Sequence, residues 1–220
     1  MADSIDVIVI GASGHGMVVC DIVMAAGGGL RAVGFVDANP ALHGTHVLDL
    51  PVSGAVEDFA SGARTRVAMG IGNNAARRRA FARVLELGLE PLTAIHPSAV
   101  LSPRAAVGRG TVVMANATIN VAAEIGEDVI INTSSSIDHH CVIGSHAHIA
   151  PGAILAGNVR VGEETLVGAG AVIIPGISVG ARCVVGAGAV VTSDVPDDVT
   201  VAGVPARPIV RPRPSQDMQV

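Results

Sequence analysis

The hydrophobic positions of this chain follow a single rule over nearly half its length. From residue 95 to residue 191, every sixth residue is Ile, Leu or Val without exception: Ile95, Leu101, Val107, Val113, Ile119, Ile125, Ile131, Ile137, Ile143, Ile149, Leu155, Val161, Val167, Ile173, Val179, Val185 and Val191. A six-residue period fits neither an α-helix nor a plain alternating strand. It is typical of a parallel β-helix, in which six residues form one short strand and one turn.

Smaller residues follow each aliphatic position of this repeat. Gly is frequent directly after the aliphatic residue, and a small residue is frequent four places after it. Three six-residue repeats make one triangular coil, so the repeat predicts nearly six coils with no inserted loop. We expect every aliphatic residue of the run to point into the core. Cys141 and Cys183 occupy small-residue positions, which predicts that both are buried packing residues.

Before the repeat, hydrophobic runs of strand character alternate with helical stretches. Strands are expected at 6–10, 31–37 and 66–70, and helices at 17–26 and 75–87. This alternation predicts a small Rossmann-like α/β domain with a parallel sheet. The predicted organisation is therefore a Rossmann-like domain at 1–92, a β-helix at 93–209 and a flexible tail at 210–220.

The turn between the first strand and the first helix reads GASGHG at residues 11–16. Glycines there would let backbone N–H groups approach a phosphate at a helix N-terminus, and Asp37 ends the second strand where a ribose-binding acid would lie. The spacing differs from G-x-G-x-x-G, so a plain tight turn is the alternative. The run Arg77, Arg78, Arg79 is interpreted as a solvated helix face.

Composition narrows the possible functions. The chain is half hydrophobic but has only three Phe and no Trp or Tyr, and all three Phe precede the repeat, so the β-helix core is aliphatic. A net charge of -5 argues against a nucleic-acid surface. Three cysteines without C-x-x-C spacing indicate a reduced, cytoplasmic protein. We expect no signal peptide and no membrane insertion.

Polar residues gather between 132 and 148, where four of the eight histidines fall within ten residues. Histidine suits proton transfer near neutral pH. Since the β-helix core is filled, we expect the site on an outer face, where subunits of a symmetric oligomer would meet.

The GASGHG loop, Phe-Val-Asp at 35–37, Ile-Gly-Asn-Asn at 71–74, the segment 132–144 and the unbroken repeat together resemble one family over residues 5–209. It is the bacterial nucleotide-aminosugar N-acetyltransferases, related to the sialic acid O-acetyltransferases. The resemblance implies a left-handed β-helix, a homotrimer with active sites between subunits, acetyl-CoA as co-substrate and no metal. It also implies acetylation of the 4-amino group of a UDP- or GDP-linked 4-amino-4,6-dideoxy sugar, for surface glycans such as O-antigen.

The resemblance further implies individual roles. His139 would be the general base, and His148 would hydrogen-bond near the acetyl carbonyl. The substrate-binding residues would be Ser13, Gly14, His15, Asp37, Gly72 and Asn132. The residues along acetyl-CoA would be His148, Gly157, Ala169 and Ala187, with Arg207 near the CoA phosphates. Direct attack needs no covalent nucleophile, so Ser134, Ser135 and Ser136 are expected to be corner and surface residues.

Two positions depart from the family pattern. Close relatives carry an acid directly after the base, whereas this chain has His140. Uridine-specific relatives often have two acids after the second strand, whereas this chain has Asp37 followed by Ala38. A guanine nucleotide such as that of GDP-perosamine is therefore a candidate.

Other readings predict different chemistry. A sialic acid type O-acetyltransferase and a non-catalytic trimer that binds sugar nucleotides are the main alternatives. An NAD-dependent oxidoreductase would use the glycine loop but leaves the repeat unexplained. A metal-dependent hydratase would use His140, His146 and His148 as ligands across an interface.

Overall fold

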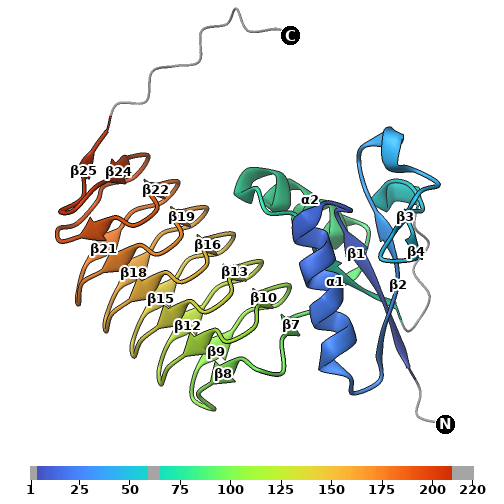
Figure 1. The fold of residues 1–220 in the computed structure, drawn as a ribbon, viewed down its shortest axis with the longest axis horizontal. Coiled ribbons are helices and arrows are strands. Elements are labelled where there is room, and N and C mark those ends of the chain that lie inside the picture. Colours follow the sequence, from blue (N-terminus) through green and yellow to red (C-terminus); the bar gives the residue numbers. More distant parts are fainter. Residues whose placement is uncertain (1–3, 59–64, 210–220) are drawn as a thin grey trace, which may run out of the picture.

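A computed structural model describes residues 4–58 and 65–209 of the protein, and the tail predicted at 210–220 lies outside them. Figure 1 shows an α/β domain joined to a prism of stacked coils. The architecture changes between β6 (Glu90–Pro91) and β7 (Ala94–Ile95). In the described residues, no helix is both long enough and apolar enough to cross a membrane.

The N-terminal domain is a parallel sheet in the order β2-β1-β5-β6. The sheet strands are β1 (Ile5–Ile10), β2 (Leu30–Val36), β5 (Thr65–Met69) and β6. The helices are α1 (Gly14–Ala26) and α2 (Asn74–Glu86), with short 3-10 turns η1 (Pro40–Leu42) and η2 (Val56–Asp58) and a hairpin of β3 (His46–Val47) and β4 (Leu50–Pro51). The strands agree with the prediction, while α1 begins three residues earlier than expected.

The repeat forms a parallel β-helix with one two-residue strand in each six-residue unit. Its strands are β7, β8 (Val100–Leu101), β9 (Ala106–Val107), β10 (Val112–Val113), β11 (Thr118–Ile119), β12 (Glu124–Ile125), β13 (Ile130–Ile131), β14 (Ser136–Ile137), β15 (Val142–Ile143), β16 (His148–Ile149), β17 (Ile154–Leu155), β18 (Arg160–Val161), β19 (Leu166–Val167), β20 (Val172–Ile173), β21 (Ser178–Val179), β22 (Val184–Val185), β23 (Val190–Val191), β24 (Thr200–Ala202) and β25 (Arg207–Pro208). Strands one coil apart pair in parallel within each sheet, and β25 turns back antiparallel to β24.

Three sheets form the faces of the prism. We name them by one strand each: the β10 face (β7, β10, β13, β16, β19, β22, β24 and β25), the β11 face (β8, β11, β14, β17, β20 and β23) and the β12 face (β9, β12, β15, β18 and β21). The chain turns at a first corner after the β10 face, as at residues 132–135, and at a second corner after the β11 face, as at 138–141. The third corner, as at 144–147, leads back to the β10 face.

The aliphatic positions from Val113 to Val191 are all buried, as predicted, and so are Cys141 and Cys183. The prediction of a uniform core is wrong at its start, because Ile95 is 36% exposed and Leu101 and Val107 are half-buried. These three side chains belong to the first coil, which has no preceding coil to cover it.

At the third corner the residue after the aliphatic position is Gly in each coil from Gly108 to Gly180, because the coils stack closely there. A Cβ added at Gly144 would lie 2.6 Å from the backbone nitrogen of Glu163 in the next coil. The left-handed backbone conformation occurs two residues later in the repeat, for example at His140 and His146, with φ of 58° and 63°. The frequent glycines therefore reflect stacking as well as turning.

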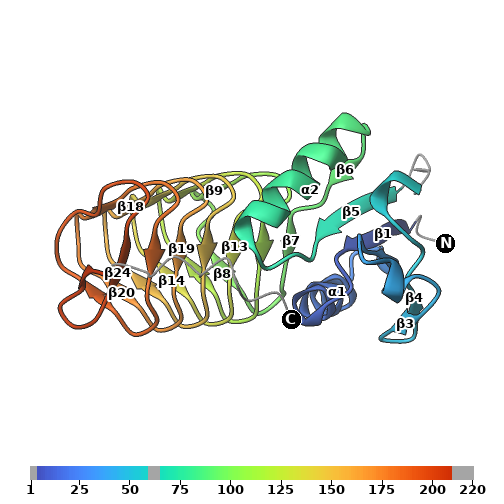
Figure 2. The ribbon, with the colours of Figure 1, turned by 90° about the horizontal axis from the view of Figure 1, so that it is seen from above.

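The N-terminal domain covers the first half of the β10 face. The outward side chains Ala94, Val112 and Ile130 are buried in one cluster with residues of β1 and α1, and Figures 1 and 2 show the domain seated at this end of the prism. The next outward position along this face is His148. This histidine therefore lies where the covered part of the face ends.

Candidate functional site

His148 is half-buried on β16, at the edge of the N-terminal domain. Its Nε2 lies 3.0 Å from the side-chain nitrogen of Asn132. The Asn132 oxygen accepts from the Thr133 backbone N–H at 2.7 Å, so its NH₂ group faces the ring. An amide nitrogen only donates. Nε2 therefore accepts, and the proton of the neutral ring lies on Nδ1.

Burial, with a smaller contribution from the charge of Arg77, lowers the pKa of His148 to about 4. The same causes lower the pKa of His15 to about 4. The two rings lie 6.3 Å apart between centroids. Among the described residues, no atom hydrogen-bonds the buried Nε2 of His15. His15, Gly72, Asn132 and His148, all expected at the site, thus meet at the seam between the two domains.

A pocket of about 590 Å³ opens beside this seam. Its wall includes Gly11 and Ser13 from the glycine loop, Asp37 after β2, and Gly72 and Arg79. Of the other predicted substrate residues, His15 and Asn132 lie at the seam, and Gly14 is exposed at the start of α1. The pocket therefore contains three of the residues expected to bind the nucleotide.

Asp37 also holds the glycine loop in place. Its carboxylate accepts hydrogen bonds from the backbone N–H groups of Ala12, at 2.7 Å, and Asn39, at 2.8 Å. Gly16 packs directly on Gly11, since a Cβ at Gly16 would overlap the Gly11 carbonyl. Close packing therefore requires Gly11 and Gly16, whether or not the loop also binds a phosphate, whereas a Cβ at Gly14 would meet no neighbouring atom.

A second groove, of about 470 Å³, begins where the pocket ends. It shares Gly72 and Asn73 with the pocket and continues past His148 to Leu166 and Val184 on the β10 face. A ligand in the pocket thus has a lined path past Gly72 to His148.

The interpretation of the arginine run as a solvated face is wrong for Arg77. Its side chain is fully buried and lies 3.3 Å from the Asp128 carboxylate at the third corner. It donates to the backbone carbonyls of His146, at 2.7 Å, and Ile71, at 3.3 Å. His146 completes the cluster through Nδ1, 2.8 Å from Asp128. Arg77 therefore links α2 to the β-helix through an ion pair and hydrogen bonds.

Burial disfavours both charges of this pair, lowering the pKa of Arg77 and raising that of Asp128. Their mutual attraction opposes both pKa shifts, and the hydrogen bond from His146 opposes the shift of Asp128. The sequence carried one signal for the cluster, because Asp128 and His146 are eighteen residues apart and thus stack at one corner. Nothing in the sequence indicated which residue of the N-terminal domain would reach them.

His139 lies exposed at the second corner, away from the seam. Its Nδ1 is 3.1 Å from Nδ1 of His140. Asp138 accepts from the backbone N–H of His139 at 2.7 Å and from the Asn120 side chain at 3.0 Å. Gly157 in the next coil supports the ring, since a Cβ there would overlap it. One chain therefore holds His139 and His148 on different parts of the prism.

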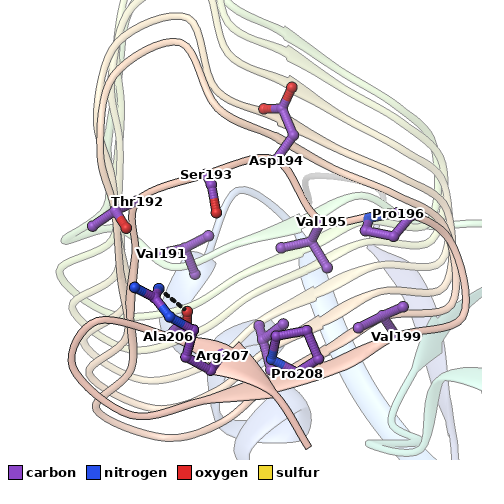
Figure 3. Close-up of a pocket in the computed structure, with 11 residues that line it drawn as sticks. Val191, Thr192, Ser193, Asp194, Val195, Pro196, Val199, Ala206, Arg207 and Pro208 are labelled. Carbon is purple, nitrogen blue, oxygen red and sulfur yellow. Dashed lines mark hydrogen bonds between the residues drawn. The ribbon is translucent and has the colours of Figure 1, made fainter.

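The residues expected along CoA occupy two corners. Gly157 lies at the second corner under His139, whereas Ala169 and Ala187 are exposed at the first corner in successive coils. Arg207, on β25, donates to the Ala206 carbonyl at 2.8 Å. Figure 3 shows Arg207 at the last coil, beside a cavity of about 310 Å³ lined by Val191, Val195 and Val199.

The three histidines of the metal alternative have separate surroundings. His140 forms a hydrogen bond with His139, His146 with Asp128, and His148 with Asn132. Within the described part of the chain, no three His, Cys, Asp or Glu side chains are arranged to hold a metal ion.

Family models match most of the chain. Residues 6–84 match the PglD N-terminal domain. Residues 122–157 match the bacterial transferase hexapeptide (six repeats), and residues 158–193 match the hexapeptide repeat of succinyl-transferase. A comparison with curated proteins gave no match.

Solved structures with the same architecture cover nearly the whole chain. The acetyltransferase domain of PglB from Neisseria gonorrhoeae, in complex with acetyl coenzyme A, is 38% identical, with a TM-score of 0.87 over 94% of this chain and 100% of that one. PerB from Caulobacter crescentus, in complex with CoA and GDP-perosamine, is 40% identical, with a TM-score of 0.84 over 93% and 97%. WeeI from Acinetobacter baumannii is 30% identical, with a TM-score of 0.86 over 92% and 99%.

Proposed function

The chain belongs to the acetyltransferases that join a PglD N-terminal domain to a left-handed hexapeptide-repeat β-helix, and on that premise we propose that it acetylates a nucleotide-linked 4-amino-4,6-dideoxy sugar. Acetyl-CoA is the acyl donor of this family. The proposal assigns the 4-amino group as acceptor and His139 as general base.

The continuous path from the pocket to the β-helix is the main support for this function. The nucleotide occupies the pocket beside Ser13 and Asp37, which leaves the sugar to extend past Gly72. His15 offers the sugar or its diphosphate a buried ring nitrogen that lacks a partner among the described residues. Asn132 and His148 lie where the sugar meets the β-helix.

The chemistry is direct acyl transfer. The sugar amine attacks the thioester carbonyl, a C–N bond forms, and the oxyanion is stabilised by hydrogen-bond donors. His139 removes the proton from the attacking nitrogen, the C–S bond breaks, and the CoA thiolate takes up a proton. Since Nδ1 of His139 already has a partner in His140, Nε2 is the nitrogen left for this step.

A homotrimer with sites between subunits fits the positions of these residues. His139 and Gly157 share the second corner, whereas Ala169 and Ala187 share the first, so one CoA molecule reaches both corners most simply between two chains. Three coils separate β16 from β24, or about 15 Å at ~4.8 Å per coil, which suits an extended CoA arm that ends near Arg207. Exposed apolar side chains at Val121 and Ile154 support association through this region.

Two observations bear on the identity of the nucleotide base. PerB, 40% identical, was solved with GDP-perosamine, and this chain has Ala38 where many uridine-specific relatives have a second acid. Both points favour GDP over UDP.

The test is thiol release from acetyl-CoA with a panel of UDP- and GDP-linked 4-amino-4,6-dideoxy sugars, each paired with its 4-hydroxy analogue. We expect turnover with an amino sugar and none with its analogue. Turnover with the hydroxy sugar would replace the proposal by O-acetylation. Nucleotide-sugar binding without turnover of any acceptor would favour a non-catalytic role.

A further inference from the structure

We propose that His140 is a positioning residue that holds the His139 ring in the tautomer required of a general base. The inference rests on the proposed function, because it gives His140 a task only if His139 accepts the proton. The family resemblance implies a carboxylate at this position, and in this chain the imidazole of His140 takes its place.

The contact between the two rings allows two arrangements of their protons. Their Nδ1 atoms are 3.1 Å apart, and the rings cross at 82°. A neutral imidazole has one N–H donor and one acceptor nitrogen, so this contact requires a proton on one Nδ1 and a lone pair on the other. When His139 donates, its Nε2 keeps the lone pair that can accept the amine proton. When His140 donates, Nε2 of His139 carries hydrogen and cannot act as the base.

Among the described residues, no other neighbour forms a hydrogen bond with Nδ1 of His139. Asp138, on the opposite side in sequence, accepts from the His139 backbone and from Asn120 rather than from the ring. Gly157 supports the ring from the next coil without contributing a side chain. In the tautomer that the proposal requires, the Nδ1 proton of His139 therefore has His140 as its acceptor.

The arrangement also serves the protonated state. After Nε2 takes the amine proton, the His139 imidazolium still donates through Nδ1 to neutral His140, and hydrogen bonds from charged donors are the stronger kind. Ala122, at the equivalent position of the preceding coil, has the same left-handed backbone as His140, with φ of 57°. Asp128, at the equivalent position of the third corner, also has it, with φ of 54°. Alanine and aspartate are therefore compatible with the backbone at residue 140.

The experiment compares the full-length parent with His140→Ala and His140→Asp, and uses exposed His46→Ala as a control for the loss of a histidine. We expect His140→Ala to lower kcat about 10- to 100-fold, by analogy with the loss seen when the hydrogen-bond partner of a metal-ligating histidine is removed. KM for both substrates should change less than twofold. His140→Asp should recover most of kcat. Parent-like kcat in His140→Ala, or equal loss in the two variants, would overturn the proposal.

Nitrogen-15 NMR of the labelled protein tests the tautomer without reference to turnover. The parent should show His139 protonated at Nδ1, and His140→Ala should show a mixture of tautomers. Protonation at Nε2 in the parent would refute the inference. If instead His139→Asn retained full turnover while the tautomer result held, the proposed base would be wrong and the ring contact correct.

Discussion

Replacement of Arg77 by Met should be the most destabilising single change at the seam between the domains. The guanidinium is fully buried, lies 3.3 Å from the Asp128 carboxylate and donates to backbone carbonyls on both sides of the seam. Met keeps most of the length of the side chain but removes the charge and every donor.

The expected cost is about 3–5 kcal/mol in the free energy of unfolding, as for other broken buried ion pairs. The main cause is that Asp128 stays fully buried with His146 as its remaining partner. Adding Asp128→Asn removes that charge, so the double variant should lose less than the sum of the two single losses. Arg79→Met, on an exposed residue of the same helix, should cost less than about 0.5 kcal/mol.

The assay is denaturant unfolding followed by circular dichroism, because the chain has no Trp or Tyr for fluorescence. Hydrogen exchange at 71–77 should rise in Arg77→Met. A loss below about 1 kcal/mol, or strict additivity with Asp128→Asn, would refute the reasoning that this ion pair joins the domains.

Two further predictions concern the histidines and their supports. Gly157→Ala should push the ring of His139 out of place and lower kcat by up to about 100-fold, measured by steady-state kinetics; an unchanged kcat would show that the ring does not need this space. His15 and His148 have folded pKa values of about 4 against about 6.5 unfolded. The unfolded chain therefore binds more protons between these values, and the free energy of unfolding should fall from pH 6.5 to 4, by at most about 3 kcal/mol per histidine. Unfolding curves at several pH values check this, and a flat profile would contradict the burial of both rings.

The β-helix could be predicted from sequence because each coil repeats the same local rule. The inward position must be aliphatic, and Gly is needed where coils stack, so the pattern is visible without knowledge of distant contacts. The rule wrongly predicts that Ile95 is buried. The repeat period does not show that the first coil has no preceding coil to cover it.

The candidate site was harder to predict because it depends on contacts between distant segments. Arg77 looks like its two solvated neighbours in sequence, and its partner Asp128 lies 51 residues away. A period of eighteen residues places His139 over Gly157, but His148 is nine residues from His139 and therefore half a coil away. Sequence alone suggested one polar cluster, whereas the chain distributes it over separate corners.

If His139 accepts the proton from the sugar amine, its removal must slow the chemical step without weakening acetyl-CoA binding. The measurement is the rate of acetyl transfer by His139→Ala at saturating acetyl-CoA and acceptor, together with the Kd for acetyl-CoA. We expect a loss of about 10²- to 10⁴-fold in kcat with a Kd within twofold of the parent. A kcat within a few-fold of the parent would contradict it.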